Sequence, residues 1–486
     1  MARLALASTV AIVAIGLACH TDATSRPRAQ GEHSAADAAP PDSVDDATSD
    51  PAADREPAER TPYTPPSTLG QPSGIRLAKR SRMVYAAPDH DALVRGRIPS
   101  KQTFHVFEER EAPGCDRPWA RVAEAAWVCL ERTERSEVEP APMPALADGA
   151  TLPYLYARHE HHDDPATPAI PVYSGISAYR ERAAPVDSLP AYGSYAFTRY
   201  RHNHGDPVFV TLDRRVVPAA GLDPFKPSEF GGRELLAQPI APGETLAWAV
   251  RWQTWIRAAP DLESERLARV TYHHTLSVVG EGVLGPGEDG EAERWMEVPA
   301  TERAPSGWVR AHDVRRFVPV PPPDPILGGQ VTVDVDLDEQ VLSVWVEDTP
   351  VFATLISSGK RNDETPPGLY RIETKRAYGK MQSMARARDP YFVEAVPWAM
   401  YFRGRYALHA AYWHDMFGHR MSHGCVNLSP RDAKRVFELA TPTLPGGWLI
   451  VHEHPSDPGA LVRVRRAGHA SPDHRGALEL SASQGG

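Results

Sequence analysis

Basic residues, cysteines and long hydrophobic runs are all scarce in this sequence. The 53 Lys and Arg residues are outnumbered by 63 Asp and Glu residues, and the net charge of −10 argues against a nucleic-acid partner. The longest mostly apolar run, residues 4–17, is too short to span a membrane as a stable helix. Only four of the 486 residues are cysteines, and one of them, Cys425, lies in a histidine-rich stretch.

Proline, by contrast, is abundant, with 48 residues. This composition is typical of linkers and β-rich modules rather than of helical bundles. A chain of 486 residues is too long for one hydrophobic core, so three or four domains are expected. The sequence therefore predicts a mostly β, multidomain protein.

Residues 1–19 have the pattern of an export signal, with Arg3 before the apolar run and small residues before Cys19. The stretch Gly16-Leu17-Ala18-Cys19 resembles a bacterial lipobox, although a branched aliphatic residue is usual at position 16. Cys19 is then the lipidation site that would anchor the protein to a membrane. Secretion without a lipid, or an apolar N-terminus with no export role, are the alternatives. The expected location is the periplasm or cell envelope.

Residues 20–72 contain hardly any large apolar side chain and are predicted to be a disordered tether. Three β modules are predicted after it, at residues 73–136, 150–238 and 244–318. The first ends with Trp119-Ala120-Arg121-Val122 and Trp127-Val128, and the third with Trp295-Met296-Glu297-Val298 and Trp308-Val309. This ending resembles that of bacterial SH3-like barrels, and its two copies indicate an internal repeat.

Cys115 and Cys129 lie on either side of the Trp119 run in the first module. In an exported chain, two such cysteines are expected to form a disulfide. A loop of 14 residues (129 − 115) closed in this way contributes roughly 3 kcal/mol if it is unstrained. Two free, buried thiols are the alternative.

A C-terminal domain is predicted at residues 330–454, after a proline-rich linker. Its expected strands begin at residues 331, 341, 352 and 448, and the first of them alternates with period two. Residues 375–396 are irregular and basic. They either cap a cleft, where they would meet an acidic peptide, or form ordinary solvated surface. Residues 455–486 are predicted to be disordered.

The stretch Ser422-His423-Gly424-Cys425-Val426-Asn427 carries the strongest chemical signal in this domain. A thiol becomes a useful nucleophile when a base takes its proton. Cys425 has two candidate bases, His423 nearby and His409, which is sixteen residues earlier (425 − 409) and can face the thiol from a neighbouring strand. Gly424 leaves the backbone bare, so a carbonyl can approach and amide N–H groups can point at an oxyanion.

A short helix is predicted directly after this stretch. Ser429 has the character of an N-cap, Pro430 stands at the first helical position and Asp432 lies three residues after the cap. Apolar residues then recur at helical spacing until Pro442. A cysteine that enters a packed helix is rigidly held.

The order His409, about a dozen residues, and then Ser-His-Gly-Cys-x-Asn resembles the L,D-transpeptidase (YkuD) family of peptidoglycan cross-linking enzymes. The resemblance covers about residues 331–454 and implies a β-sandwich catalytic domain with a short helix after the cysteine. It implies that Cys425 is the acyl-accepting nucleophile. His409 is then the general base, with its ring held by the backbone carbonyl of Ala410.

The same resemblance assigns supporting roles. Ser422, His423 and Gly424 are motif residues beside the thiol, and the amides around Gly424 and Cys425 form the oxyanion hole. Asn427 and Trp413 help to line the acyl-donor pocket. Which of His409 and His423 is the base is open from the residues alone.

The implied reaction is attack of Cys425 on the carbonyl before the terminal D-residue of a peptidoglycan stem tetrapeptide, with loss of D-alanine. An amine of another stem or of a protein then accepts the acyl group. Water as the acceptor makes the enzyme a carboxypeptidase. Two further alternatives are a cell-wall-binding protein with an inactive transpeptidase fold and a thiol hydrolase that acts on other peptides.

No cofactor and no metal are expected. His414, His419, His423 and Cys425 are residue types that bind zinc, but their spacings of 5, 4 and 2 match no finger or H-E-x-x-H pattern. The acidic and histidine-rich run at residues 159–164 is interpreted as a solvated loop, because nothing fixes its side chains at a defined spacing.

Overall fold

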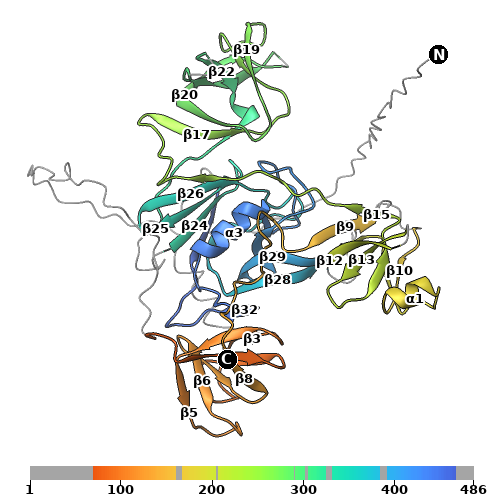
Figure 1. The fold of residues 1–486 in the computed structure, drawn as a ribbon. Coiled ribbons are helices and arrows are strands. Elements are labelled where there is room, and N and C mark those ends of the chain that lie inside the picture. Colours follow the sequence, from red (N-terminus) through yellow and green to blue (C-terminus); the bar gives the residue numbers. More distant parts are fainter. Residues whose placement is uncertain are drawn as a thin grey trace, which may run out of the picture. The chain divides into compact units, whose positions relative to one another are not determined.

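The structure is a computed structural model that describes residues 69–159, 167–203, 206–288, 290–301, 305–323, 331–383 and 391–466. The predicted export signal with Cys19, most of the predicted tether, and residues 160–164 lie outside these ranges. Strands predominate in the described residues, as predicted for a mostly β chain (Figure 1). Within the same ranges, no helix combines the length and apolar character that crossing a membrane requires.

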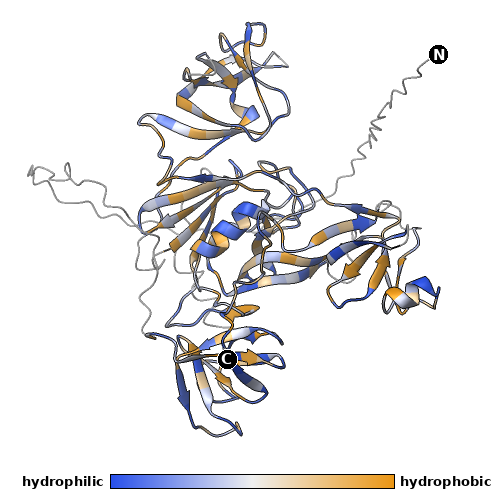
Figure 2. Ribbon diagram, viewed as in Figure 1, coloured by the Kyte–Doolittle hydropathy of each residue, from blue (hydrophilic) through white to orange (hydrophobic). Residues whose placement is uncertain are grey.

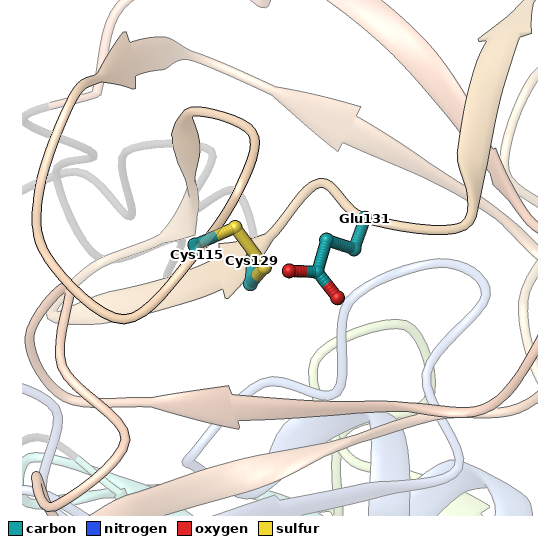
Figure 3. A group of neighbouring side chains, drawn as sticks. All are labelled: Cys115, Cys129 and Glu131. Atoms are coloured by element: carbon teal, nitrogen blue, oxygen red, sulfur yellow. A yellow bond between two sulfur atoms is a disulfide. The ribbon is translucent and has the colours of Figure 1, made fainter.

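The first module consists of β1 (Gly74–Ala78), β2 (Arg82–Tyr85), β3 (Val94–Ile98), β4 (Thr103–Val106), β5 (Glu108–Arg110), β6 (Trp119–Ala123), β7 (Ala126–Cys129) and β8 (Thr133–Ser136). These strands lie in the orders β4-β1-β8 and β3-β2-β7-β6-β5, and they share a core that includes Phe104 and Val128. Cys115 and Cys129 are joined by a disulfide, with the Glu131 side chain next to it (Figure 3). Glu131 accepts a hydrogen bond of 3.1 Å from the Asp116 N–H.

The second module consists of β9 (Leu155–His159), β10 (Ile170–Val172), α1 (Ile176–Arg180), β11 (Asp187–Leu189), β12 (Gly193–Asn203), β13 (Asp206–Thr211), β14 (Val216–Pro218), β15 (Leu222–Pro224) and β16 (Arg233–Glu234). Two of these strands extend the sheets of the C-terminal domain. β12 pairs in parallel with β29 (Phe392–Arg403), and β16 pairs with β26 (Thr349–Leu355). This module therefore shares its backbone hydrogen bonding with the C-terminal domain.

The third module consists of β17 (Glu244–Ala249), β18 (Thr254–Arg257), β19 (Arg266–Val270), β20 (Thr275–Pro286), β21 (Ala292–Val298), β22 (Gly307–Arg310), the 3₁₀ helix η1 (Ala311–Asp313) and β23 (Val314–Arg316). They form a sheet in the order β19-β18-β22-β21-β20-β17-β23. The two tryptophan segments lie on the paired strands β21 and β22, as those of the first module lie on β6 and β7. This correspondence fits an internal repeat, whereas the SH3-like identity of both modules stays a prediction.

The C-terminal domain adds β24 (Val331–Asp336), β25 (Val341–Val346), β27 (Gly368–Arg371), β28 (Thr374–Gln382), β30 (Tyr406–Ala410), β31 (Val426–Leu428), α3 (Pro430–Leu439), β32 (Ile450–His452) and β33 (Leu461–Arg465). One sheet has the order β16-β26-β25-β24-β33-β27, and the other runs from β32 through β28, β29 and β30 to β31. Val333, Met400 and Val436 pack in a core made by both sheets and α3. Hydrophobic residues are interspersed with hydrophilic ones along these strands (Figure 2).

Helix α3 begins as the sequence predicts. The Ser429 hydroxyl accepts a hydrogen bond of 3.2 Å from the Asp432 N–H, and Pro430 occupies the first helical position. Residues on the apolar face, such as Ala433 and Val436, are buried. The helix therefore fixes the strand β31 that follows Cys425, because the two elements are separated by Ser429 alone.

The prediction that residues 455–486 are disordered is wrong for their first part. Residues 461–465 form β33, which pairs in parallel with β24. Asp334 of β24 is buried and forms ion pairs with Arg463 and Arg465. The alternation of apolar and basic residues at 461–465 matches the alternation of apolar and acidic residues at 331–336, and the charges neutralise each other inside the sheet.

The interpretation of residues 375–396 as irregular is also wrong for the residues that the structure describes, 375–383 and 391–396. Residues 374–382 form β28, which pairs with β29 and β32. Lys375, one of the basic residues of this stretch, is buried, and its Nζ donates to the carbonyls of Phe437 and Ala440 at 2.6 and 2.7 Å. A cation at the C-terminal end of α3 stabilises the helix dipole.

Candidate active site

The two candidate catalytic residues lie on neighbouring strands. β30 and β31 pair in parallel, with His409 opposite Asn427 and Leu408 opposite Val426. Cys425 directly precedes β31. The pairing therefore places Cys425 two positions before Asn427, the residue opposite His409, although sixteen positions separate His409 and Cys425 in sequence (425 − 409).

Both residues line one cavity of about 230 Å³. The C-terminal domain forms most of the cavity wall, and the second module completes it. The lining residues are Arg158, Tyr192, Gly193, Ser194 and Phe225 from the second module, and Met381, Tyr391, Phe392, Val393, His409, Trp413, Met421, Ser422, His423, Cys425 and Asn427 from the C-terminal domain.

The Ser422 hydroxyl shapes the backbone around the cysteine. It donates to the Cys425 carbonyl and accepts a hydrogen bond of 3.1 Å from the Gly424 N–H. The Gly424 amide is therefore already engaged and does not serve the predicted oxyanion hole in this state. The Cys425 N–H has no acceptor among the described residues, so it is the amide of this pair that remains available to an oxyanion.

Position 424 requires glycine. Its φ is +110°, a conformation that side chains rarely adopt, and a Cβ at this position would lie 2.6 Å from Cε1 of Tyr406. The Gly424 carbonyl accepts a hydrogen bond of 2.8 Å from the buried hydroxyl of Thr365, which itself accepts one from the Gly359 N–H. These contacts hold the backbone before the thiol in one conformation.

His409 is buried, and its Nδ1 lies 3.0 Å from the Ala410 carbonyl. Since a carbonyl only accepts, Nδ1 carries the proton and Nε2 keeps its lone pair. Burial lowers the pKa of His409 to about 4. The imidazole is therefore neutral at physiological pH, which is the form that a general base requires.

The Cys425 thiol lies against the backbone that precedes His409. Its S–H donates to the Arg405 carbonyl at 3.7 Å, and the backbone of Ala407 also hydrogen-bonds the sulfur. The sulfur is partly open to the cavity but is otherwise enclosed by protein, and this desolvation raises the pKa of the thiol. Because the Cys425 thiol and the His409 imidazole are both neutral, we expect His409 to take the thiol proton during the attack. A thiolate–imidazolium pair formed beforehand is not expected.

This protonation state predicts the reactivity of the thiol. We expect iodoacetamide to alkylate Cys425 more slowly at pH 7 than it alkylates glutathione, and the rate to rise through the alkaline range, because the thiolate is the reactive form and its pKa is raised. Mass spectrometry of the peptide that contains residue 425 measures the rate separately from other cysteines. A rate that levels off below pH 7 would show a stabilised thiolate and contradict the expectation.

His414 has a role that the sequence reasoning missed. Its Nδ1 accepts a hydrogen bond of 3.2 Å from the Met416 N–H, and its Nε2 lies 3.0 Å from the side-chain amide of Asn427. Burial lowers the pKa of His414 to about 4, so the ring is neutral. His414 thus orients the side chain of the pocket residue Asn427. The Asn427 backbone is held by Ser357, whose N–H donates to the Asn427 carbonyl and whose carbonyl accepts from the Asn427 N–H. Asn427 also lies next to His409, because the two residues are opposite each other on the paired strands β30 and β31.

The residues of the alternative zinc site lie in separate environments. The His419 Nε2 is 2.8 Å from the Val250 carbonyl, and the His423 ring stacks on Tyr391 with a centroid distance of 5.1 Å. Among the described residues, the group whose ligand atoms lie close enough for a metal is Cys115, Cys129 and Glu131, and both its sulfurs belong to the disulfide (Figure 3).

Trp413 lies in the cavity wall as expected, with its ring centroid 5.8 Å from that of His409. The next residue back, Tyr412, stacks on Tyr156 of the second module at 3.7 Å. The Tyr156 hydroxyl donates to the Ala395 carbonyl. These contacts place the second module against the catalytic strands, and they explain how Arg158 reaches the cavity.

Residues 330–463 match the family model of the YkuD L,D-transpeptidase catalytic domain. This part of the chain is therefore an L,D-transpeptidase catalytic domain of the YkuD family. The match extends past the predicted boundary at residue 454 and includes most of β33.

Several solved structures are similar to a part of the chain, whereas no curated protein matches the sequence significantly. An L,D-transpeptidase from Stackebrandtia nassauensis is 28% identical with a TM-score of 0.21, and the match covers 29% of this chain and 58% of that chain. The catalytic domain of an E. faecium L,D-transpeptidase is 22% identical with a TM-score of 0.23, over 28% of this chain and 96% of that one. This chain thus spans less than two thirds of the S. nassauensis chain.

Proposed function

We propose that this protein is an L,D-transpeptidase that acts on peptidoglycan stem peptides in the cell envelope. The observation that carries the proposal is the shared cavity of Cys425 and His409, in which the Ala410 carbonyl fixes the histidine tautomer, within a domain of the YkuD family. The proposed location rests on the export pattern of residues 1–19.

The first half of the reaction forms an acyl-enzyme. The Cys425 side chain turns from the Arg405 carbonyl toward His409, and Nε2 takes the thiol proton as the sulfur attacks the peptide carbonyl. The oxyanion accepts a hydrogen bond from the Cys425 N–H. The C–N bond then breaks, His409 returns the proton to the leaving amine, and D-alanine departs with a thioester left on the sulfur.

The second half transfers the acyl group. An acceptor amine attacks the thioester carbonyl and gives a proton to Nε2 of His409, and the carbon–sulfur bond breaks with return of that proton to Cys425. The acceptor of the proposed reaction is an amine of a second stem peptide.

The test is to incubate the full chain with purified disaccharide-tetrapeptide and to follow the products by mass spectrometry. Transpeptidation predicts release of D-alanine together with a cross-linked dimer. Release of D-alanine with a tripeptide as the single other product would identify a carboxypeptidase. Absence of D-alanine release would identify a binding protein with an inactive fold and overturn the proposal.

Arg158 is expected to bind the carboxylate of the leaving D-alanine. It is the lining residue of the cavity that carries a permanent charge, and its guanidinium lies over the Phe225 ring at 5.5 Å. Replacement of Arg158 by Gln should raise KM for the tetrapeptide about tenfold or more, because a charge-assisted hydrogen bond is lost. Steady-state D-alanine release measures the effect.

Two comparisons separate recognition from a structural effect of this substitution. Arg199→Gln removes a charge from an exposed position of β12 and should leave KM unchanged. A tetrapeptide with a C-terminal carboxamide should be processed poorly by the unmodified protein and no worse by Arg158→Gln. If Arg158→Gln and Arg199→Gln both show the same ratio of activities on the acid and the amide substrate as the unmodified protein, Arg158 does not bind the carboxylate.

A further inference from the structure

The third module contains a cavity of about 520 Å³, larger than the cavity of the catalytic cysteine. It opens at the ends of β18, β19 and β22. Its lining residues are Arg251, Trp252, Gln253, Trp255, Arg257, Leu262, Arg266, Glu288, Arg310, His312 and Asp313. None of these residues has a part in the proposed acyl transfer, so the cavity has no assigned purpose.

Arg257 is the unusual residue of this cavity. It is 8% exposed, and its one hydrogen bond among the described residues is a 2.8 Å contact from Nη1 to the Ser264 carbonyl. No carboxylate of the described residues lies within ion-pair distance of it. A guanidinium has five N–H donors, and no Arg257 nitrogen is both fully buried and unpartnered, so the donors that do not reach Ser264 are open to the cavity.

The surroundings of Arg257 add positive charge. Burial lowers the pKa of Arg257, and the nearby cations Arg266 and Arg310 lower it further, while Glu263 and Asp261, which do not line the cavity, act in the opposite direction. Arg310 is itself neutralised, because it pairs with Glu288 and with Asp313 at 3.0 Å. Four arginines and two carboxylates line the cavity, so the balance is positive. A bound anion would relieve this repulsion and satisfy the remaining donors of Arg257.

Two tryptophans give the cavity flat apolar walls. Trp252 is 63% exposed, which is unusual for so large an apolar side chain, and one face of its ring stacks on Tyr272 at 4.4 Å. Trp255 carries the guanidinium of Arg266 over its ring at 5.1 Å. Stacked aromatic rings held by their neighbours are rigid surfaces for the C–H face of a sugar ring, while Gln253 and the carboxylates can accept hydrogen bonds from its hydroxyls.

We propose that this cavity binds an acidic saccharide, with the carboxylate on Arg257 and Arg266 and a sugar ring on Trp252. A carboxylate matches the planar fork of a guanidinium, and a sugar supplies both the flat face and the hydroxyl donors that the rest of the lining suits. The third module then attaches the chain to an anionic glycan independently of the reaction at Cys425.

The test compares ligands that differ in one group, with the full chain and ligand-observed NMR. Glucuronate should bind at least tenfold more tightly than glucose, which has the same ring without the carboxylate. Arg257→Gln and Arg266→Gln should each weaken glucuronate binding at least tenfold, and Trp252→Ala should weaken glucose and glucuronate alike. Arg294→Gln, an exposed position on β21 outside the cavity, is the matched control and should bind as the unmodified protein does.

Arg266 and Trp252 are exposed, so their variants keep the test informative even if Arg257→Gln lowers the melting temperature. Equal binding of glucose and glucuronate, or unchanged glucuronate binding in Arg266→Gln, would overturn the proposal. Binding of inorganic phosphate but not of glucuronate would show a phosphate site instead. Binding of acetyl-dialanine but not of glucuronate would show a peptide site, which equally contradicts a saccharide ligand.

Discussion

Replacing Cys425 with alanine should lower D-alanine release from the tetrapeptide by at least about a thousandfold, because no other group in the cavity can hold the acyl chain as a thioester. The substitution removes one sulfur atom whose hydrogen-bond contact is weak, at 3.7 Å from the Arg405 carbonyl. The melting temperature should therefore change little. Mass spectrometry of the free amino acid and of the intact protein measures both release and acylation.

The control for this substitution is a second variant of the same motif that leaves the thiol in place. Asn427→Asp preserves the size of a buried pocket residue and keeps Cys425 available for acylation. It should still form a detectable acyl-enzyme, while Cys425→Ala should form none. Retained D-alanine release in Cys425→Ala would exclude the cysteine as the nucleophile.

The second large effect is expected at His409. His409→Gln should slow acylation at least about a hundredfold, because Nε2 is the acceptor of the thiol proton and glutamine supplies no comparable base. His423→Gln is the matched comparison and should cost at most about tenfold, since its ring stacks on Tyr391 at the edge of the cavity. Single-turnover acylation, followed by intact mass, separates this step from transfer to the acceptor.

His409 is buried, so its replacement can also lower stability. Circular dichroism melting of both variants distinguishes loss of fold from loss of base. If His423→Gln acylates slowly while His409→Gln acylates normally, His423 is the general base. The His409 tautomer that the Ala410 carbonyl fixes is then not needed for acylation.

Local chemistry was predictable from the sequence where it depends on neighbouring residues. The cap formed by Ser429, the proline at the first turn and the apolar face of α3 are all local, and the structure has them. The alternation at residues 331–337 likewise predicted a strand correctly, and the strand expected to begin at residue 341 is also present. The spacing of His409 and Cys425 was enough to place them on neighbouring elements.

What the sequence did not reveal depends on partners that are distant in the chain. Lys375 is a surface residue by type, but its buried amine caps α3 through carbonyls more than sixty positions away. The parallel pairing of β12 with β29, which brings Arg158 into the cavity, joins segments about 200 positions apart, and no local pattern encodes it. The engagement of the Gly424 amide by Ser422 depends on one side-chain rotation, which residue types do not specify.

The contacts of the third module with the residues before the motif have a practical consequence. Val250 accepts from His419, Arg315 donates to the Gly418 carbonyl at 3.1 Å, and Tyr272 donates to the Phe417 carbonyl at 3.2 Å. Trp248 and Trp345 belong to one apolar cluster that spans the two domains. A truncated protein cut at the limits of the family match would expose this cluster to water and lose a wall of its cavity, so expression trials and inhibitor screens should use the chain from the first module onward.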